Sequence, residues 1–251
     1  MNRWIAALPV FNERDTVGAV LDEVKHFAGS ILVVDDGSTD GTSELLAGRH
    51  DVTTVRHDQN QGYGAALKTA FRYAIEEGYE AIVTLDCDGQ HQPKRIPRFI
   101  AATKNADIVS GSRYLKQYPG DDAPPPQRLF INRTITRQLN HRLNLSLTDA
   151  FCGFKAYRTR CLRELEPKLT DLGYAMPLQF WVEVAVMNLR VLEIPVPLIY
   201  LDLNRTFGGT LDHAETRLQH YNNVFEEALD RACREGRVLP EQRKLCQEMP
   251  G

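Results

Sequence analysis

The sequence lacks any long apolar run, and its cysteines are few and scattered. No stretch reaches the roughly 18 consecutive apolar residues of a membrane-spanning helix, so we expect no such helix. The five cysteines form neither a C-x-x-C pair nor a zinc-type spacing, and an odd number does not suit a disulfide framework. We therefore expect reduced thiols in a cytoplasmic protein, which the lack of an apolar signal-peptide core also favours.

The chain also lacks a surplus of basic residues. It has 30 Lys and Arg against 33 Asp and Glu, and a net charge of −3 argues against a general nucleic-acid binder with a broad basic surface. With 43% hydrophobic and 25% charged residues, the chain can bury a full core. Its 251 residues suit one large α/β domain.

Two aspartates separated by one residue, Asp86 and Asp88, follow a short apolar run at 81–85. Side chains at i and i+2 of an extended strand point to the same side, so the two carboxylates would face one point where the strand ends. Hard oxygen ligands of this kind suit Mg²⁺ or Mn²⁺, which complete their coordination with substrate phosphates and water. An Asp-rich turn that caps the next helix is the alternative interpretation.

Strand-like and helix-like segments alternate along the first half of the chain. The predicted strands share short β-prone apolar runs, at 5–10, 30–34, 52–55, 81–85 and 107–111. This alternation predicts a mostly parallel, doubly wound sheet. The strand at 30–34 also ends in carboxylates, at Asp35 and Asp36. Because ligands of such sheets bind outside the carboxyl ends of the strands, two acidic strand ends predict one site.

Five motifs stand in one order along the first 113 residues. They read Leu8-Pro-Val-Phe-Asn-Glu13, Val34-Asp-Asp-Gly-Ser-Thr-Asp40, Asn60-Gln-Gly-Tyr-Gly-Ala65, Asp86-Cys-Asp-Gly-Gln-His91 and Ser110-Gly-Ser-Arg113. Together they resemble the family 2 glycosyltransferases with the GT-A fold, in particular the polyprenyl-phosphate sugar transferases typified by dolichol-phosphate mannosyltransferase. The resemblance implies a Rossmann-like GT-A catalytic domain at 1–211, followed by a C-terminal amphipathic helix and tail at 212–251.

The resemblance also implies which residues bind the sugar nucleotide. The implied ligands of the nucleotide sugar are Pro9, Asn12, Glu13, Asp36, Asp86 and Gln90, with Asp36 toward the base or ribose. The implied ligands of Mg²⁺ or Mn²⁺ are Asp86, Asp88 and Gln90, and Asp88 counts as catalytic. A divalent ion would stabilise the negative charge that develops on the diphosphate leaving group. The family inverts the anomeric carbon by direct displacement.

The middle of the chain is expected to bind the acceptor. Residues 115–126 are rich in Pro, Gly and Asp and predict a mobile loop, and a helix should begin near Gln127. Six Lys or Arg side chains lie between Arg113 and Arg142 against two acids, which makes this segment a candidate anion site. A solvated helix face is the alternative for at least Arg137 and Arg142, whereas Arg113 and Arg128 match the acceptor-phosphate residues of the polyprenyl branch.

Two further candidates follow from the resemblance. Asp149 begins an Asp-x-x-x-Gly-Phe signature and would either organise the acceptor pocket or act as a general base; a turn cap is the structural alternative. Arg205 stands in an Arg-x-x-Gly-x-Thr match and is a candidate catalytic contact to the diphosphate from a flexible loop. Glu183 lies off the apolar helical stripe at 178–189, which we expect to pack in the core.

These observations predict a metal-dependent, inverting glycosyltransferase that moves a hexose from a GDP- or UDP-sugar to a polyprenyl phosphate. Three alternatives remain: a soluble family 2 enzyme with a hydroxyl acceptor on a glycan or small molecule, a nucleotidyltransferase, and a sugar-nucleotide sensor. We expect a cytoplasmic location, with peripheral contact at the cytoplasmic face of a membrane left open. The C-terminal helix is expected to pack on the catalytic domain or on a partner subunit, so a homo-oligomer is also left open.

Overall fold

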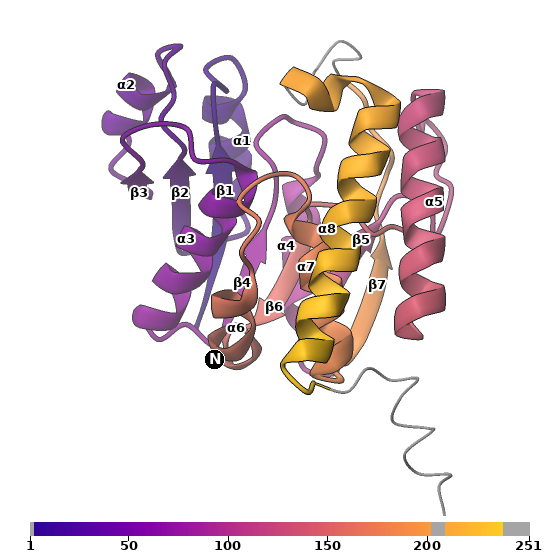
Figure 1. Ribbon diagram of the computed structural model, residues 1–251. Helices are drawn as coiled ribbons and strands as arrows, with labels where there is room; N and C mark the ends of the chain where they lie inside the picture. Colours follow the sequence, from indigo (N-terminus) through magenta and orange to yellow (C-terminus); the bar gives the residue numbers. More distant parts are fainter. Residues whose placement is uncertain (1–2, 202–208, 238–251) are drawn as a thin grey trace, which may run out of the picture.

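The computed structural model describes residues 3–201 and 209–237, and their strands form one seven-stranded sheet of order β3-β2-β1-β4-β6-β5-β7 (Figure 1). The strands are β1 (Trp4–Val10), β2 (Ile31–Asp35), β3 (Thr53–Arg56), β4 (Ala81–Thr84), β5 (Ile108–Ser112), β6 (Lys155–Arg158) and β7 (Val191–Pro195). β6 runs antiparallel to both of its neighbours, and every other pair is parallel. The predicted mostly parallel α/β sheet is confirmed.

The order of the strands creates a crevice at the carboxyl edge of the sheet. β1 has β2 on one side and β4 on the other, because the chain first winds outward to β3 and then returns across β1. Val10 at the end of β1 pairs with Asp35 at the end of β2, so both strands deliver their following loops to the same edge. Such a switch point is where open α/β sheets bind ligands.

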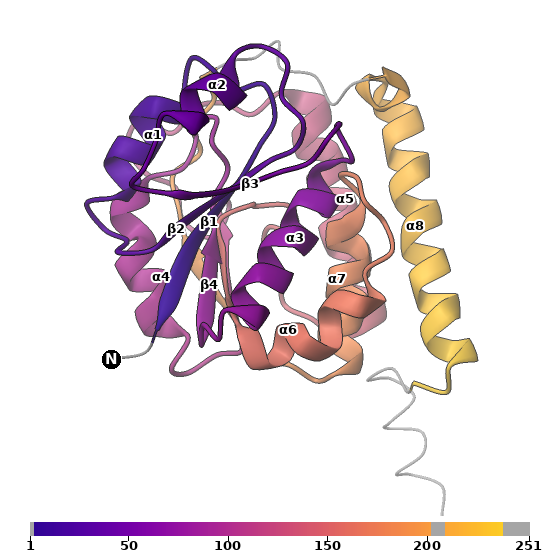
Figure 2. The same cartoon turned by 90° about the vertical axis from the view of Figure 1, so that its left-hand side faces the viewer.

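Two layers of helices cover the two faces of the sheet (Figure 2). Successive side chains of β1 alternate between them: Ala6 and Leu8 enter one apolar core, and Ile5 and Ala7 enter the other. The first core is covered by α1 (Val17–Val24), α2 (Thr42–Ala47) and α4 (Ile96–Ala102). The second is covered by α3 (Tyr63–Glu76), α5 (Pro126–Leu143), α6 (Thr159–Leu165) and α7 (Met176–Val186). The carboxyl edge of the sheet therefore lies between two packed layers of helices.

The long helix α8 (Ala214–Arg234) forms an outer layer over α5 and α7 (Figure 2). It buries Tyr221, Phe225 and Leu229, which recur at helical spacing and join the second core. No helix among the described residues is long and apolar enough to cross a membrane. The apolar face of α8 therefore packs against α5 and α7.

Ion pairs and hydrogen bonds hold α8 and the residues after it in place. Arg237 pairs with Glu183 of α7, whose side chain is fully buried, and Lys168 lies 4.0 Å from the same carboxylate. On α8 itself, a guanidinium nitrogen of Arg231 donates to the backbone oxygen of Lys168 at 2.8 Å. Because a buried carboxylate is costly without a cation, residue 237 is part of the folded unit.

Most of the predicted elements are observed, and two are new. The five predicted strands of the first half and the helices that follow them occur within a few residues of their expected bounds. β6 was missed because Lys155-Ala-Tyr-Arg158 carries no apolar run; its strand pairing with β4 and β5 creates the strand. α6 was missed as well. The proposed boundary at residue 211 stays a prediction.

Candidate active site

A cavity of about 630 Å³ opens at the carboxyl edge of the sheet. The loops after β1, β2, β4 and β5 line one part of it, and α5 and α8 line another. Of the predicted site residues, those that line the cavity are Pro9, Glu13, Asp36, Asp86, Asp88, Gln90, Arg113 and Arg128. The fold thus brings the donor candidates and the acceptor candidates into a single space.

Asp36 organises the end of the cavity that the sequence predicts to bind the nucleotide, here called the nucleotide end. Its Oδ1 accepts a hydrogen bond from the backbone N–H of Gln61 at 2.9 Å, and its Oδ2 accepts one from that of Gly62 at 2.8 Å. The same Oδ1 lies 2.6 Å from Nδ1 of His57. Gly62 has a φ of +105°, and an added Cβ would lie 2.3 Å from the Leu172 oxygen, so only glycine fits there. Asp36 therefore fixes the Gly-rich turn that opens α3.

Asn12 is placed differently from the other donor candidates. It is exposed, with a left-handed φ of 55°, and does not appear among the described residues that line the cavity. Its Oδ1 accepts from the backbone N–H of Thr39 at 2.9 Å, and its own N–H donates to Oγ of Ser38 at 2.9 Å. Asn12 thus ties the turn after β1 to the turn after β2. Its direct contact with a nucleotide stays a prediction.

The two aspartates lie just beyond β4, which ends at Thr84, and both line the cavity. Oδ1 of Asp86 accepts a hydrogen bond from the hydroxyl of Tyr63 at 3.0 Å. Oδ1 of Asp88 accepts one from the backbone N–H of Gln90 at 3.0 Å. Both carboxylates therefore accept a hydrogen bond from the protein, and both residues line the cavity.

Burial raises the pKa of Tyr63 well above its ordinary value, and the charge of Asp86 acts in the same direction. The phenol thus keeps its proton and stays a donor to Asp86. Tyr63 also stacks on Tyr174, with 5.6 Å between the ring centroids. The sequence placed Tyr63 in a motif but gave it no role. Only its pairing with Asp86 across the fold reveals one.

Gly153 explains part of the Asp-x-x-x-Gly-Phe signature. An added Cβ at this position would lie 2.3 Å from Oδ2 of Asp86. Glycine is therefore needed so that the Asp86 side chain can pack against the backbone of the segment before β6.

The predicted metal ligands suit a divalent ion whose coordination is completed by the phosphates of a substrate. Across the described residues, no group of three or more His, Cys, Asp and Glu side chains could hold a metal by itself. Mg²⁺ commonly takes one or two carboxylates and fills its remaining positions with phosphate oxygens and water. Two carboxylates and an amide beside an open cavity, as at Asp86, Asp88 and Gln90, fit that pattern.

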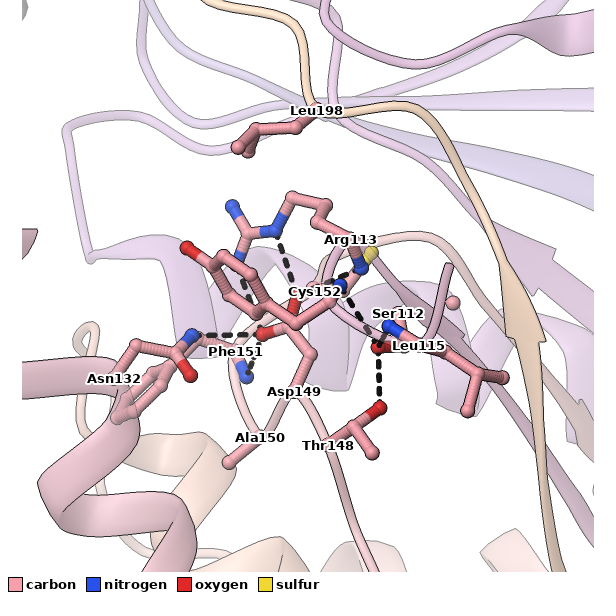
Figure 3. A network of polar contacts seen from close by, with 12 residues as sticks. Ser112, Arg113, Leu115, Asn132, Thr148, Asp149, Ala150, Phe151, Cys152 and Leu198 are labelled. Atoms are coloured by element: carbon pink, nitrogen blue, oxygen red, sulfur yellow. Dashed lines mark hydrogen bonds and ion pairs between the residues drawn. The ribbon is translucent and has the colours of Figure 1, made fainter. Parts of the chain in front are cut away.

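Arg113, whose side chain is 20% exposed and lines the cavity, forms an ion pair with the fully buried Asp149 at the end that the sequence predicts to bind the acceptor, here called the acceptor end (Figure 3). Nε of Arg113 donates to Oδ2 of Asp149 at 2.7 Å, and Nη2 donates to Oδ1 at 3.0 Å. Asn132 Nδ2 and the backbone N–H of Phe151 also donate to Oδ1, at 2.8 and 3.1 Å. Asp149 is fully buried and does not appear among the described residues of the cavity wall.

The environment of Asp149 favours its charged form. Burial raises the pKa of this carboxyl, but the attraction of Arg113 and the hydrogen bonds from Arg113 and Asn132 outweigh burial and hold the pKa below its usual range. A carboxylate with a low pKa and two occupied oxygens is a poor general base. The geometry suits a residue that organises the pocket by orienting Arg113.

Two residues of α8, Arg217 and Tyr221, line the cavity near Arg128, a predicted acceptor residue. Arg217 is 4% exposed and lines it together with Arg128 of α5. Tyr221, one helical turn later, also lines it and stacks on Phe151 at 5.2 Å between ring centroids. From the sequence, this helix was expected to pack on the catalytic domain or a partner subunit, with contact to a membrane surface left open. The spacing of Arg217 and Tyr221 was the signal, because a charged residue four positions before a core residue lies on the same face.

Residues 6–166 match the sequence profile of the family described as "Glycosyl transferase family 2". This chain belongs to glycosyl transferase family 2. It is a nucleotide-sugar-dependent glycosyltransferase, as the motifs predicted.

The relatives of the glycosyltransferase include two named bacterial enzymes. It is 31% identical to undecaprenyl-phosphate mannosyltransferase of Micrococcus luteus, over 84% of this chain and 90% of the relative. It is 30% identical to polyprenol monophosphomannose synthase of Mycolicibacterium smegmatis, over 92% of this chain and 90% of the relative. The predicted resemblance to the polyprenyl-phosphate branch is confirmed.

A solved structure confirms the GT-A fold of the glycosyltransferase. The crystal structure of mannosyl-3-phosphoglycerate synthase from Rubrobacter xylanophilus matches with a TM-score of 0.65. The two chains are 16% identical, and the match covers 94% of this chain and 76% of that one.

One candidate of the glycosyltransferase cannot be placed. Arg205 lies in 202–208, outside the described residues, so its contact with the diphosphate stays a prediction.

The family match ends at residue 166, which leaves α7, β7 and α8 beyond it. Some residues that line the cavity, among them Arg217 and Tyr221 of α8, therefore lie beyond the family match.

Proposed function

We propose that this glycosyltransferase transfers a hexose from a nucleoside diphosphate sugar to a polyprenyl phosphate, with inversion and with Mg²⁺ or Mn²⁺ as cofactor. One observation carries the proposal: a carboxylate pair and several arginines line the same cavity. The carboxylates suit a metal-bound diphosphate, and the arginines suit a second anion. The named activities of the two curated relatives support the same acceptor.

The donor would lie between the Gly-rich turn and the aspartates. Pro9, Glu13 and the turn held by Asp36 form the nucleotide end, and Asp86 and Asp88 lie beside the diphosphate. A bound divalent ion would neutralise the charge that develops on the diphosphate as it leaves. Tyr63 keeps its proton and orients Asp86 throughout.

The acceptor phosphate needs no protein base. A phosphate monoester has a second pKa near 6 and is largely a dianion at neutral pH. One of its oxygens attacks the anomeric carbon while the bond to the diphosphate oxygen breaks, and the electron pair leaves with the nucleoside diphosphate. No proton has to move, and the single displacement inverts the anomeric carbon.

The hydroxyl-acceptor alternative has less support from the geometry. An alcohol must lose its proton to a carboxylate within hydrogen-bond reach. Asp149, the sequence-based candidate for that base, is fully buried and accepts hydrogen bonds from the protein on both oxygens. We therefore assign Asp149 to pocket organisation and Arg113 and Arg128 to the acceptor side. A lipid acceptor also implies that the enzyme works at a membrane surface, through peripheral contact.

The test is transfer of labelled sugar to two acceptors of equal chain length, a short polyprenyl phosphate and the matching free alcohol. GDP-mannose and UDP-hexoses serve as donors, with Mn²⁺, with Mg²⁺ and with EDTA. We expect labelled polyprenyl phosphate only with metal present, and a product whose anomeric configuration is opposite to that of the donor. Labelling of the alcohol alone would refute the hypothesis of a phosphate acceptor. Full activity in EDTA would refute the hypothesis of metal dependence.

A further inference from the structure

Tyr174 places an aromatic side chain in the wall of the cavity. The residue is 37% exposed and lies shortly before α7, beyond the family match that ends at residue 166. The predicted ligands of the nucleotide sugar, by contrast, are polar side chains and one proline. A ligand that packs against Tyr174 would remove this exposed aromatic surface from water, which is favourable.

Tyr174 lies next to the predicted metal site. Its ring stacks on that of Tyr63, with 5.6 Å between the centroids and 14° between the ring planes. The hydroxyl of Tyr63 in turn donates to Oδ1 of Asp86 at 3.0 Å. One aromatic side chain therefore connects Tyr174 to a predicted ligand of the diphosphate.

The segment that carries Tyr174 is held from two sides. The backbone oxygen of Leu172 accepts a hydrogen bond from the N–H of Ala65, in the first turn of α3, at 3.1 Å. From α7, Oε1 of Gln179 accepts one from the backbone N–H of Thr170 at 2.8 Å. These bonds fix the segment before a ligand arrives, so that little conformational freedom is lost on binding.

The hexose is the part of the donor that suits this aromatic side chain. A pyranose ring carries C–H groups on its faces as well as hydroxyls, and the negative face of an aromatic ring attracts the partly positive hydrogens of such groups. Because the hexose is bonded directly to the diphosphate, it lies beside the residues that hold the diphosphate. Tyr174 meets this requirement through Tyr63 and Asp86. A polyprenyl chain, in contrast, leads away from the anomeric carbon on the far side of its phosphate.

We propose that Tyr174 binds the hexose of the donor by stacking its ring against one face of the pyranose. The position of the diphosphate at Asp86 and Asp88 rests on the proposed function.

The experiment compares Tyr174→Leu and Tyr174→Phe with the wild type in the full chain, without an acceptor. Leucine removes the aromatic ring, whereas phenylalanine removes only the hydroxyl. Leu172→Ala is the matched control, because Leu172 is 43% exposed in the same segment and does not appear among the described residues of the cavity wall. Calorimetry with Mn²⁺ gives the Kd values of two pairs of ligands, GDP-mannose with GDP and UDP-glucose with UDP. The Tm of each protein is measured as well.

In the pair that the wild type binds more tightly, we expect Tyr174→Leu to raise the Kd of the nucleotide sugar by roughly three- to tenfold, as for loss of one aromatic contact. The Kd of the free nucleoside diphosphate should not change. Tyr174→Phe and Leu172→Ala should match the wild type for both ligands.

Two results would overturn the inference by assigning Tyr174 another role. If Tyr174→Leu raises both Kd values by the same factor, Tyr174 acts on the diphosphate through Tyr63 and Asp86 and does not bind the hexose. If Tyr174→Phe loses as much affinity for the nucleotide sugar as Tyr174→Leu, the hydroxyl and not the ring makes the contact. If Tyr174→Leu does not fold, Tyr174→Met takes its place in the comparison, because a methionine side chain packs adaptably.

Failure of the inference is distinguishable from failure of the proposed function. A wild type that labels only the free alcohol refutes the phosphate acceptor, but these Kd values are measured without an acceptor and still decide the role of Tyr174. If Asp88→Asn binds the free nucleoside diphosphate as the wild type does, the diphosphate lies elsewhere, and the two Kd values of Tyr174→Leu again decide. Equal Kd values of the wild type and Tyr174→Leu for the nucleotide sugar, or no binding of either nucleotide sugar by the wild type, overturn the inference.

Discussion

Replacement of Asp149 by Asn separates the two roles that this residue could have. The Asp149 carboxylate accepts five hydrogen bonds, three of them from Arg113. An amide keeps the shape but turns an NH₂ group toward donors, and it leaves the Arg113 charge buried without its counter-ion. Removal of one partner of a buried ion pair costs about 3–5 kcal/mol of unfolding free energy.

For a chain of this size, that loss corresponds to a fall in Tm of about 6–20 °C, at 2–4 °C per kcal/mol. Differential scanning calorimetry at pH 7 gives the measurement. The double variant Arg113→Met with Asp149→Asn should recover part of the loss, because it removes both charges. A single variant that melts within 1–2 °C of the wild type would refute the assignment of Asp149 as the organiser of the pocket.

The pH dependence gives an independent check with a definite sign. Burial raises the pKa of Asp149, but Arg113 and the hydrogen bonds outweigh it, so the folded pKa lies below the unfolded value of about 3.9. The stability that the carboxylate contributes is therefore fully present above about pH 4 and is lost as the pH falls through the folded pKa. The gap in unfolding free energy between wild type and Asp149→Asn should stay constant from pH 8 to 5 and should narrow below pH 4. A gap that widens in acid would contradict this linkage.

Three further changes test the donor side. Asp88→Asn should keep the Tm but lose most of the transfer rate, because it removes a charged metal ligand; turnover equal to the wild type would show that the aspartates do not bind the metal. Gly153→Ala should lower kcat by about a hundredfold, since its Cβ would displace the Asp86 carboxylate by up to an ångström. A calorimetric titration with Mn²⁺ and a nucleoside diphosphate should then show weakened binding, and unaltered binding would refute the steric argument. Arg205→Ala should reduce kcat more than it weakens nucleotide binding, if its loop closes over the reacting complex; equal effects on both would contradict loop closure.

The sequence could predict which residues after β1, β2 and β4 line the cavity, because these signals are local. One apolar strand ends in Asp35 and another ends two residues before Asp86, and parallel pairing with β1 brings those ends to the same edge of the sheet. The acceptor half depends on contacts between distant segments. Arg217 reaches the cavity only because α8 folds back over α5 and α7, and no local pattern encodes that path.

The same limit applies to buried charge. Glu183 lies off the apolar stripe of its helix and therefore reads as exposed, yet α8 and Arg237 cover it completely. Lys155 sits in a strand without an apolar run, yet it is buried because β6 inserts between β4 and β5. Secondary-structure propensity describes a segment in isolation. The burial of a charged side chain depends instead on the distant elements that pack against it.

The outer position of α8 has a consequence for folding of the enzyme during its synthesis on the ribosome. The predicted nucleotide and metal ligands from Pro9 to Gln90 have been synthesised by the time Gly153 is added, whereas Arg217 follows 64 positions later. At 5–20 residues per second, this interval lasts about 3–13 s. During it, the apolar faces of α5 and α7 that Tyr221 and Phe225 will cover have no partner from α8. We therefore expect the nascent chain to expose a transient chaperone-binding surface until α8 packs on these helices and Arg237 pairs with Glu183.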